Sequence, residues 1–283
     1  MILIADSGST KTSWAVTGPE SHQQIIQTQG LNPYFTSPGQ IHEVFRDELI
    51  PFLDPSSVTG IFFYGAGCST ELNNRLVASQ LSNFFPAAGI HIYHDILGAA
   101  RALFGSNPGI ACILGTGSNS SYYDGKEIFS DIPSLGYLFG DEGAGSSLGK
   151  KLLEKYLRKE FSGSLLDAFD QSYGLSLEEI LNSLYNKPFP NRYLASFSPF
   201  LLAHKEKPEI HDLIFSSFTE FMDRHVTRYS RYLSVPAGFL GSIAYLYRDI
   251  LYEAAAVRSV IISSILPSPM EGLLAFHGIR NST

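Results

Sequence analysis

The sequence predicts an α/β protein of two lobes, because one order of elements occurs in it twice. Three short extended segments are followed by alternating helical and extended patterns, and this order begins again after residue 107. Short apolar runs bounded by turn residues predict strands, and apolar residues at helical spacing predict the helices between them. We expect two similar sheets with a central cleft between the lobes, and a helical insertion in the second lobe.

The first half alternates strands and helices in a simple order. Strands are expected at residues 2–5, 13–17, 24–28, 61–64 and 91–93, and helices at 40–53, 70–84 and 96–104. Glycine and proline at residues 105–108 mark a boundary. We therefore assign residues 1–107 to the first lobe, and we expect the final helix, 269–283, to complete it.

The second half repeats this order around a long insertion. Strands are expected at residues 110–114, 120–123 and 126–129, followed by a mostly helical block from about 146 to 233. The order then resumes with a strand at 237–241, a helix at 243–256, a strand at 259–263 and the final helix from about 269. Residues 108–268 form the expected second lobe.

The composition argues against several classes of protein. The 283 residues carry a formal net charge of −7, and because a polyanion requires a basic face, nucleic acid is not an expected partner. The apolar runs fall short of the ~20 residues that span a membrane, and the N-terminus lacks the pattern of an export signal, so no membrane partner is expected. Two cysteines, Cys68 and Cys112, build no disulfide framework, which favours a reducing, cytoplasmic setting.

The segment DSGSTKT, residues 6–12, joins two expected strands and is therefore the tip of a hairpin. Gly8 permits a positive φ, and the small hydroxyl residues beside it leave backbone N–H groups open to an anion. A P-loop is a poor match, because it needs a second glycine before the lysine and a helix after it. An ordinary polar hairpin and a phosphate-binding turn both stay open for this segment.

A second glycine-rich turn, LGTGSN at residues 114–119, lies at the equivalent place in the second half. One such turn is a weak signal, but two at equivalent places of a duplicated fold predict a triphosphate bound from both sides. A third turn, residues 65–70, lacks the last glycine of a dinucleotide fingerprint. It is better interpreted as a helix cap by Ser69 or Thr70.

Asp95 follows an expected strand and begins a helix, and ligands in open α/β sheets bind at the carboxyl ends of strands. It is placed to accept the proton of a substrate hydroxyl. The alternative is a helix N-cap, which position alone slightly favours. Together with the two predicted phosphate-binding turns, however, Asp95 is better interpreted as a catalytic residue. Nearby His91 and His94 lack the spacing and partners of a metal site.

The segment GDEGAGS, residues 140–146, places two adjacent carboxylates among glycines before a helix. Asp141 and Glu142 suit sugar hydroxyls or Mg²⁺, which prefers oxygen ligands. The alternative is stabilisation of the helix dipole by acidic residues. Gly241, between a strand and a helix, would let an adenine or ribose lie against the backbone, although by itself it is a packing glycine.

Taken in order, these motifs resemble the N-acetylglucosamine kinase group, in the BadF/BadG/BcrA/BcrD ATPase family of the actin/hexokinase/heat-shock-chaperone ATPase superfamily. The matching segments are DSGSTKT (6–12), GLNP (30–33), YHD (93–95), LGTGSN (114–119), GDEG (140–143) and FLGSI (239–243). The resemblance covers nearly the whole chain. It implies duplicated ribonuclease H-like lobes, as in actin-like ATPases, and an ATP-dependent sugar kinase. The implied acceptor is a hydroxyl, expected to be O6, of N-acetylglucosamine or a related amino sugar.

The resemblance also implies cofactors and residue roles. ATP and Mg²⁺ are implied, with Asp95 as the catalytic base and Asp6 near the metal through water. ATP and phosphate contacts are implied for Asp6, Gly8, Ser9, Thr10, Lys11, Gly115, Thr116, Gly117, Ser118 and Gly241. Sugar contacts are implied for Asn32, Asp95, Thr116, Asn119 and Asp141. A homodimer is compatible with the long insertion, whose pattern does not require one.

Two other functions fit parts of the pattern. One is a catalytically weak sensor that binds sugar and ATP. The other is an activator of acyl-CoA dehydratases, which in the same broad family holds an iron–sulfur cluster through two cysteines of each subunit. Cys68 and Cys112 lie beside a helix cap and in a strand, so we expect both to be small buried residues. Ser134-Leu135 stands where related kinases often have Gly-Trp, which leaves the identity of the amino sugar open.

Overall fold

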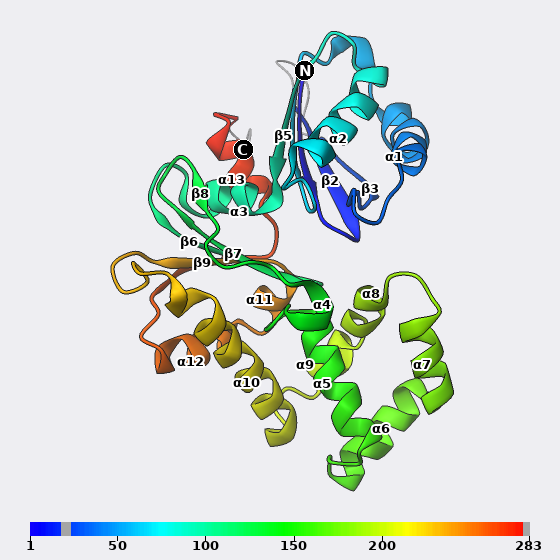
Figure 1. Cartoon of the computed structure of the whole chain (residues 1–283), viewed down its shortest axis with the longest axis vertical. Coiled ribbons are helices and arrows are strands. Elements are labelled where there is room, and N and C mark those ends of the chain that lie inside the picture. The colour runs from blue at the N-terminus through cyan, green and yellow to red at the C-terminus, as the bar shows by residue number, and fades with distance from the viewer. Residues whose placement is uncertain (18–23, 280–283) are drawn as a thin grey trace. The chain divides into compact units, whose positions relative to one another are not determined.

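The computed structural model describes residues 1–17 and 24–279 (Figure 1). The chain divides into two compact units. The first contains Met1–Asn107, Tyr123–Ile128 and Ser268–Thr283, and the second contains Pro108–Tyr122 and Phe129–Pro267. Each unit is organised around its own five-stranded sheet.

The sheet of the first unit has the order β3-β2-β1-β4-β5. Its strands are β1 (Ile2–Ser7), β2 (Lys11–Thr17), β3 (Gln24–Gln29), β4 (Gly60–Gly65) and β5 (Gly89–His94). β1, β2 and β3 pair antiparallel, whereas β4 and β5 continue parallel to β1. The carboxyl ends of β1, β4 and β5 therefore lie at one edge of the sheet, where α/β proteins bind ligands.

Alternation of side chains along the strands gives this sheet two apolar faces. On one face the fully buried Trp14 packs against Phe45 and Phe63, with ring centroids 5.8 and 5.7 Å away. On the other face Ile4 and Tyr64 pack against the C-terminal helix α13 (Met270–Phe276). This helix, red in Figure 1, lies beside α3 (Asp95–Phe104).

The remaining helices of the first unit begin at residues suited to cap them. α1 (Pro38–Val44) has a capping box made by Ser37 and Gln40. α2 (Glu71–Phe84) begins after Thr70, whose side chain accepts a hydrogen bond from the Asn73 N–H. The turn at residues 65–70 therefore ends in a helix cap, as predicted, and Thr70 is the capping residue.

The sheet of the second unit has the order β10-β9-β6-β7-β8. Its strands are β6 (Gly109–Leu114), β7 (Ser118–Tyr123), β8 (Ile128–Phe129), β9 (Ala237–Leu240) and β10 (Ile262–Leu266). Counted along each half, both sheets have the strand order 3-2-1-4-5. The predicted duplication of an α/β unit is therefore confirmed.

A helical block separates β8 from β9, which confirms the predicted insertion. It consists of α4 (Gly136–Phe139), α5 (Gly145–Leu157), α6 (Gly163–Tyr173), α7 (Leu177–Tyr185), α8 (Pro190–Ala195), α9 (Ser198–Ala203) and α10 (Pro208–Arg224). Phe169 is the centre of an aromatic cluster in this block, with Phe197 and Phe200 at 5.8 and 5.2 Å between ring centroids. Leu152 and Phe218, on α5 and α10, belong to the same core as the sheet.

Several predicted elements have wrong bounds; for example, the predicted strand 126–129 is only two residues, Ile128–Phe129. The predicted helix 40–53 ends as α1 at Val44 and continues in a π-helical and a 3₁₀ turn, because Pro51 has no N–H to donate. The predicted helix 243–256 is divided into α11 (Ser242–Leu246) and α12 (Arg248–Val257). The predicted strand 259–263 begins only at Ile262, because the preceding residues, with Ser259 at φ +55°, end α12.

The predicted final helix, residues 269–283, is shorter in the structure, where α13 ends at Phe276 and His277 follows as its C-cap; residues 280–283 lie outside the described residues. Among the residues that are described, no helix combines the length and apolarity that crossing a membrane requires.

Candidate active site

In the first unit, residues 6–12 form a hairpin tip between β1 and β2, as predicted. The N–H of Gly8 donates to the carbonyl of Lys11 across the turn, at 3.0 Å, and the N–H of Gly30 donates to the carbonyl of Thr10, at 3.1 Å. A strand follows the lysine, which rules out a P-loop. Gly30 lies so close to the tip that a Cβ on it would be 2.5 Å from the carbonyl oxygen of Gly8. The tip is therefore held in place by backbone contacts.

Asp6 and Asp95 lie in this unit at the carboxyl ends of β1 and β5, respectively. Burial and, to a smaller extent, the charge of Asp95 together raise the pKa of Asp6 to about 7, although Lys11 opposes the shift. Asp95 is the first residue of α3, and His94 occupies the N-cap position. The alternative role of Asp95 as the N-cap is therefore wrong. Its Oδ1 accepts a hydrogen bond of 2.7 Å from the Ile96 N–H and lies 3.1 Å from His94 Nε2.

Asn32 is buried beside the same hairpin tip. Its Nδ2 donates to Ser9 Oγ at 3.2 Å, and its Oδ1 accepts a hydrogen bond of 3.1 Å from the Tyr34 N–H. Gly67, at φ +78°, leaves room for the Asn32 amide, which a Cβ at that position would displace. The third glycine turn thus packs against a candidate sugar-binding residue.

In the second unit, the turn at residues 114–119 meets the N-terminus of α5. The N–H groups of Gly145 and Ser146 donate to the carbonyls of Gly115 and Thr116, at 2.9 and 3.0 Å. Gly241, at φ +120°, approaches the carbonyl of Leu114 too closely for any side chain at position 241. The second turn and the candidate adenosine-binding glycine therefore lie side by side.

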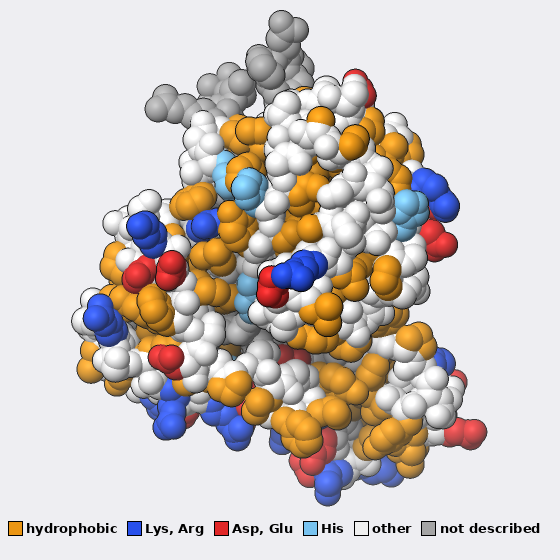
Figure 2. Space-filling view, turned by 45° about the horizontal axis from the view of Figure 1, so that its top comes forward, with side chains coloured by type: hydrophobic (Ala, Val, Ile, Leu, Met, Phe, Trp, Pro, Cys, Tyr) orange, Lys and Arg blue, Asp and Glu red, His pale blue; other side chains and the backbone are white. Residues whose placement is uncertain are grey.

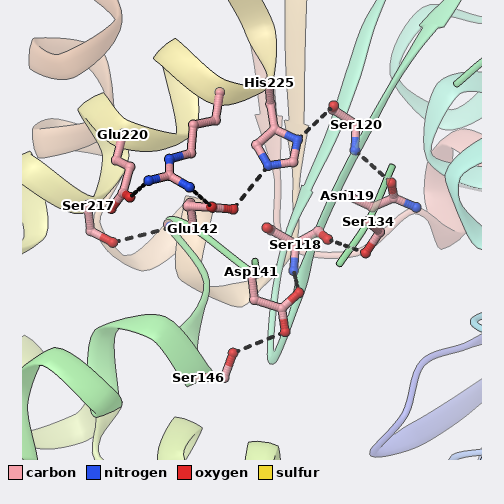
Figure 3. Close-up of polar contacts among 12 residues, drawn as sticks. Ser118, Asn119, Ser120, Ser134, Asp141, Glu142, Ser146, Ser217, Glu220 and His225 are labelled. Carbon is pink, nitrogen blue, oxygen red and sulfur yellow. Dashed lines mark hydrogen bonds and ion pairs between the residues drawn. The ribbon is translucent and has the colours of Figure 1, made fainter. Parts of the chain in front are cut away.

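The carboxylate of Asp141 is held against the second turn (Figure 3). Its Oδ1 accepts a hydrogen bond of 3.0 Å from the Ser118 N–H, and its Oδ2 accepts one of 3.2 Å from Ser146 Oγ. Burial raises the pKa of Asp141, and these two hydrogen bonds oppose the shift. Asp141 has a φ of +60°, which is unusual for a residue with a side chain. Asn119 follows on the same strand, and its Oδ1 accepts a hydrogen bond from the Ser120 N–H.

Glu142 has partners that the sequence did not reveal. Its carboxylate oxygens contact Arg224 Nη1 at 3.1 Å and His225 Nε2 at 3.2 Å. His225 Nδ1 lies 3.3 Å from Ser120 Oγ, which lies 3.0 Å from the hydroxyl of Tyr229. Arg224 ends α10, and His225 and Tyr229 follow it. No local sequence signal marks the three residues, because they reach Glu142 only through packing of the helical block.

A pocket of about 310 Å³ lies beside Asp141 within the second unit. It is lined by Ser118, Ile132, Pro133, Ser134, Leu135, Gly140, Asp141, Glu142, Asp223, Arg224, His225 and Arg228. Ser118 Oγ is buried and has no hydrogen-bond partner among the residues that the structure describes. Because an unsatisfied buried hydroxyl costs about 1–3 kcal/mol, a polar group of a ligand would be favoured here.

The predicted site residues thus form two groups, one on each unit. The first unit carries Asp6, Gly8, Ser9, Thr10, Lys11, Asn32 and Asp95. The second unit carries Gly115, Thr116, Gly117, Ser118, Asn119, Asp141 and Gly241. Each group combines a glycine turn with a carboxylate that is at least partly buried.

Comparison with solved structures identifies relatives of the whole chain. A protein of Porphyromonas gingivalis, named as a candidate N-acetylglucosamine kinase, is 42% identical, with a TM-score of 0.93 over 98% of both chains. The chain belongs to the N-acetylglucosamine kinase-like family. The family resemblance and the enzyme class expected from the sequence, a carbohydrate kinase, are confirmed by this relationship. No family model and no curated protein sequence matches the chain.

More distant structures share the fold of this N-acetylglucosamine kinase-like protein. A ROK family glucokinase of Streptomyces griseus, in complex with glucose and AMPPNP, is 11% identical, with a TM-score of 0.55 over 97% of both chains. MreB 5 of Spiroplasma citri, bound to AMPPNP, is 10% identical, with a TM-score of 0.58 over 98% of this chain and 93% of that one. The predicted actin-like ATPase fold is confirmed.

The two cysteines of the N-acetylglucosamine kinase-like chain are free and buried, as expected. Burial raises the pKa of Cys68 to about 12, with a further contribution from Asp95, and burial also raises the pKa of Cys112. Because the thiolate is the form that binds metal, neither residue suits an iron–sulfur cluster. The alternative of a dehydratase activator is therefore not supported.

Proposed function

We propose that the chain transfers the γ-phosphoryl group of ATP to O6 of N-acetylglucosamine or a closely related amino sugar. The observation that carries this proposal is that Asp6 and Asp95 lie at the carboxyl ends of β1 and β5, which both run parallel to β4 in the first unit. The full-length relationship to a candidate N-acetylglucosamine kinase supports the choice of acceptor.

Asp95 is the proposed general base, which accepts the proton of the sugar hydroxyl as that oxygen attacks the γ-phosphate. Asp95 begins α3 directly after β5, so its carboxylate is held at the sheet edge where a ligand would bind. Proposed contacts to the phosphates and adenosine of ATP come from Gly8, Ser9, Thr10, Lys11, Gly115, Thr116, Gly117, Ser118 and Gly241. Proposed contacts to the sugar come from Asn32, Thr116, Asn119 and Asp141, together with Asp95.

Asp6 is the proposed anchor for Mg²⁺, through water. A carboxylate whose ionisation is opposed by burial and by a second carboxylate suits a divalent cation, and Mg²⁺ prefers oxygen ligands. When bound, the ion would neutralise charge on the phosphates. The residues present therefore fit the proposed cofactor.

Proposed partners are the amino sugar and ATP, in the cytoplasm, without nucleic acid or membrane. On the face drawn in Figure 2, Lys and Arg side chains are interspersed with acidic, apolar and uncharged ones.

A homodimer is also proposed, because Leu177, Leu181 and Tyr185 form one apolar stripe on α7, with exposures of 55, 42 and 81%. Light scattering of the wild-type chain and of Leu181→Glu tests it, and a wild-type monomer at micromolar concentration would contradict it.

The catalytic proposal is tested by ADP release with Mg²⁺, ATP and a panel of N-acetylglucosamine, glucosamine, N-acetylmannosamine and glucose. We expect preference for N-acetylglucosamine, with ³¹P–¹H correlation locating the phosphate on O6. Asp95→Asn should lower kcat by about a hundredfold or more and leave the Kd for ATP within about twofold. Asp124→Asn, at an exposed turn of the same unit, is the matched control. Sugar binding by calorimetry without any ADP release would favour the sensor instead.

A further inference from the structure

Glu142 is buried next to Asp141, and each of its carboxylate oxygens has a partner. Arg224 donates to Oε1 and also pairs with Glu220 at 2.9 Å, so its guanidinium is held between two carboxylates. His225 contacts Oε2 and is equally buried. Glu142 is therefore attached to the end of α10 and does not face solvent.

The hydrogen bonds beyond His225 run in one direction. A carboxylate only accepts, so His225 Nε2 carries the proton toward Glu142, and in the neutral imidazole Nδ1 then accepts from Ser120 Oγ. Burial raises the pKa of Tyr229, so its hydroxyl keeps its proton and donates to Ser120. Each of the three hydrogen bonds in the chain Tyr229–Ser120–His225–Glu142 then has one donor and one acceptor.

Through β7 and the peptide bond between Asp141 and Glu142, this chain forms a closed path that includes Asp141 (Figure 3). Ser120 lies on β7 two residues after Ser118, whose N–H donates to Asp141 Oδ1. Asp141 is joined by one peptide bond to Glu142, which is tied back to β7 through His225. Both adjacent carboxylates are therefore fixed to the same strand by separate routes.

We infer that His225 and Glu142 are positioning residues that orient the Asp141 carboxylate toward the sugar. This inference rests on the proposed function, in which Asp141 accepts hydrogen bonds from sugar hydroxyls. Asp141 has a positive φ, a conformation that persists only when the surrounding structure holds it. The second turn has its own attachment, because Gly145 and Ser146 donate to it directly. Loss of His225 should therefore disturb the sugar and leave the nucleotide largely unaffected.

The test compares two substitutions of one residue. His225→Phe removes both hydrogen bonds and keeps a ring against Phe221, whose centroid lies 4.6 Å from that of His225. We expect its KM for N-acetylglucosamine to rise tenfold or more, and its KM for ATP to stay within about twofold. His225→Gln can still donate to Glu142 and accept from Ser120, and should return the sugar KM to within about threefold of wild type. His211→Phe, within α10, is the control outside the site.

Each outcome is decisive. Equal rises in both KM values, an unchanged sugar KM in folded His225→Phe, or failure of His225→Gln to restore it would overturn the inference. If His225→Phe does not fold, Ser120→Ala removes the same link to β7, and an unchanged sugar KM there would overturn it equally. A wild-type chain that releases no ADP with any amino sugar would defeat the proposed function itself, and the inference with it.

Discussion

The hydroxyl of Tyr64 lies 2.9 Å from Nε2 of His277, although 213 positions separate the two residues in the chain. Arg101 Nη1 donates to the same hydroxyl at 2.8 Å, so the tyrosine proton is available for His277 Nε2, which must be the unprotonated nitrogen. Arg101 also lies over the rings of Tyr93 and Phe276, at 4.6 and 4.8 Å. A neutral histidine at the end of α13 thus helps to fasten this helix to the first unit.

This contact predicts a loss of stability in acid. Burial, with the nearby charges of Arg101 and His91, lowers the pKa of His277 to about 4. In the unfolded chain, His277 takes up a proton near pH 6.5. The contribution of His277 to the free energy of unfolding is therefore complete above pH 6.5 and is lost as pH falls toward 4. We expect the free energy of unfolding of the wild type, relative to His277→Gln, to decrease by about 1–3 kcal/mol over that range.

Urea titrations at pH 4.5, 5.5, 6.5 and 7.5 measure this difference. His277→Gln keeps an acceptor for Tyr64 but does not titrate, so it isolates the protonation of the imidazole. A difference that stays constant with pH would show that His277 is not held neutral.

The raised pKa of Asp6 predicts a stability contribution with the opposite pH dependence to that of His277. Its carboxyl has a pKa of about 7 in the folded chain, against an ordinary value of 3.8. The folded state therefore binds the proton more tightly, and the contribution of Asp6 to stability is complete below pH 3.8 and is lost as pH rises through 7. Without Mg²⁺, the stability of the wild type relative to Asp6→Asn should fall by at most about 4 kcal/mol between pH 4 and 8.

The effect of Mg²⁺ on thermal stability tests the metal-binding role of Asp6 separately. At pH 8 a cation bound near the ionised carboxylate should raise the Tm of the wild type, and Asp6→Asn should respond less. Equal shifts in both proteins would mean that the ion binds elsewhere.

The close contact between Gly117 and the Asp141 carboxylate predicts that a side chain at position 117 would weaken sugar binding. A Cβ at position 117 would lie 2.9 Å from Asp141 Oδ2, whereas one at Gly115 would meet no described atom within 4 Å. Gly117→Ala should therefore displace the carboxylate and raise the sugar KM about tenfold or more. Gly115→Ala, in the same turn, should leave the sugar KM within about twofold. Kinetics with saturating ATP test this pair, and an equal sugar KM for both variants would contradict the predicted fit.

Features encoded by neighbouring residues could be predicted from the sequence. The two hairpin turns need only glycine and small polar residues between strands, and both lie where expected, at residues 6–12 and 114–119. The cap of α2 by Thr70 is equally local. The duplicated strand order followed from repeated patterns, because each pattern reports one element and its neighbours.

Features that depend on distant packing could not be predicted. His225 is 83 positions from Glu142, and the two residues meet only because α10 packs against the second sheet's core. The start of β10 was misplaced for a related reason. Val260 and Ile261 are apolar, yet the N–H of Val260 donates to the carbonyl of Ala255 and belongs to the end of α12. Apolar pattern alone does not distinguish a helix end from a strand.

Gly30 supplies the sharpest test of the first hairpin. A Cβ there would lie 2.5 Å from the carbonyl oxygen of Gly8 and 2.6 Å from backbone atoms of Thr10. These neighbours are all backbone, so no side-chain rotation relieves the contact, and Gly30→Ala should destabilise the first unit by about 1–3 kcal/mol and weaken ATP binding. Gly39→Ala in α1 meets nothing and should stabilise the chain by about 0.5 kcal/mol. Urea unfolding and calorimetry with ATP compare the two variants. Normal ATP affinity in Gly30→Ala would show that this hairpin does not contribute to ATP binding.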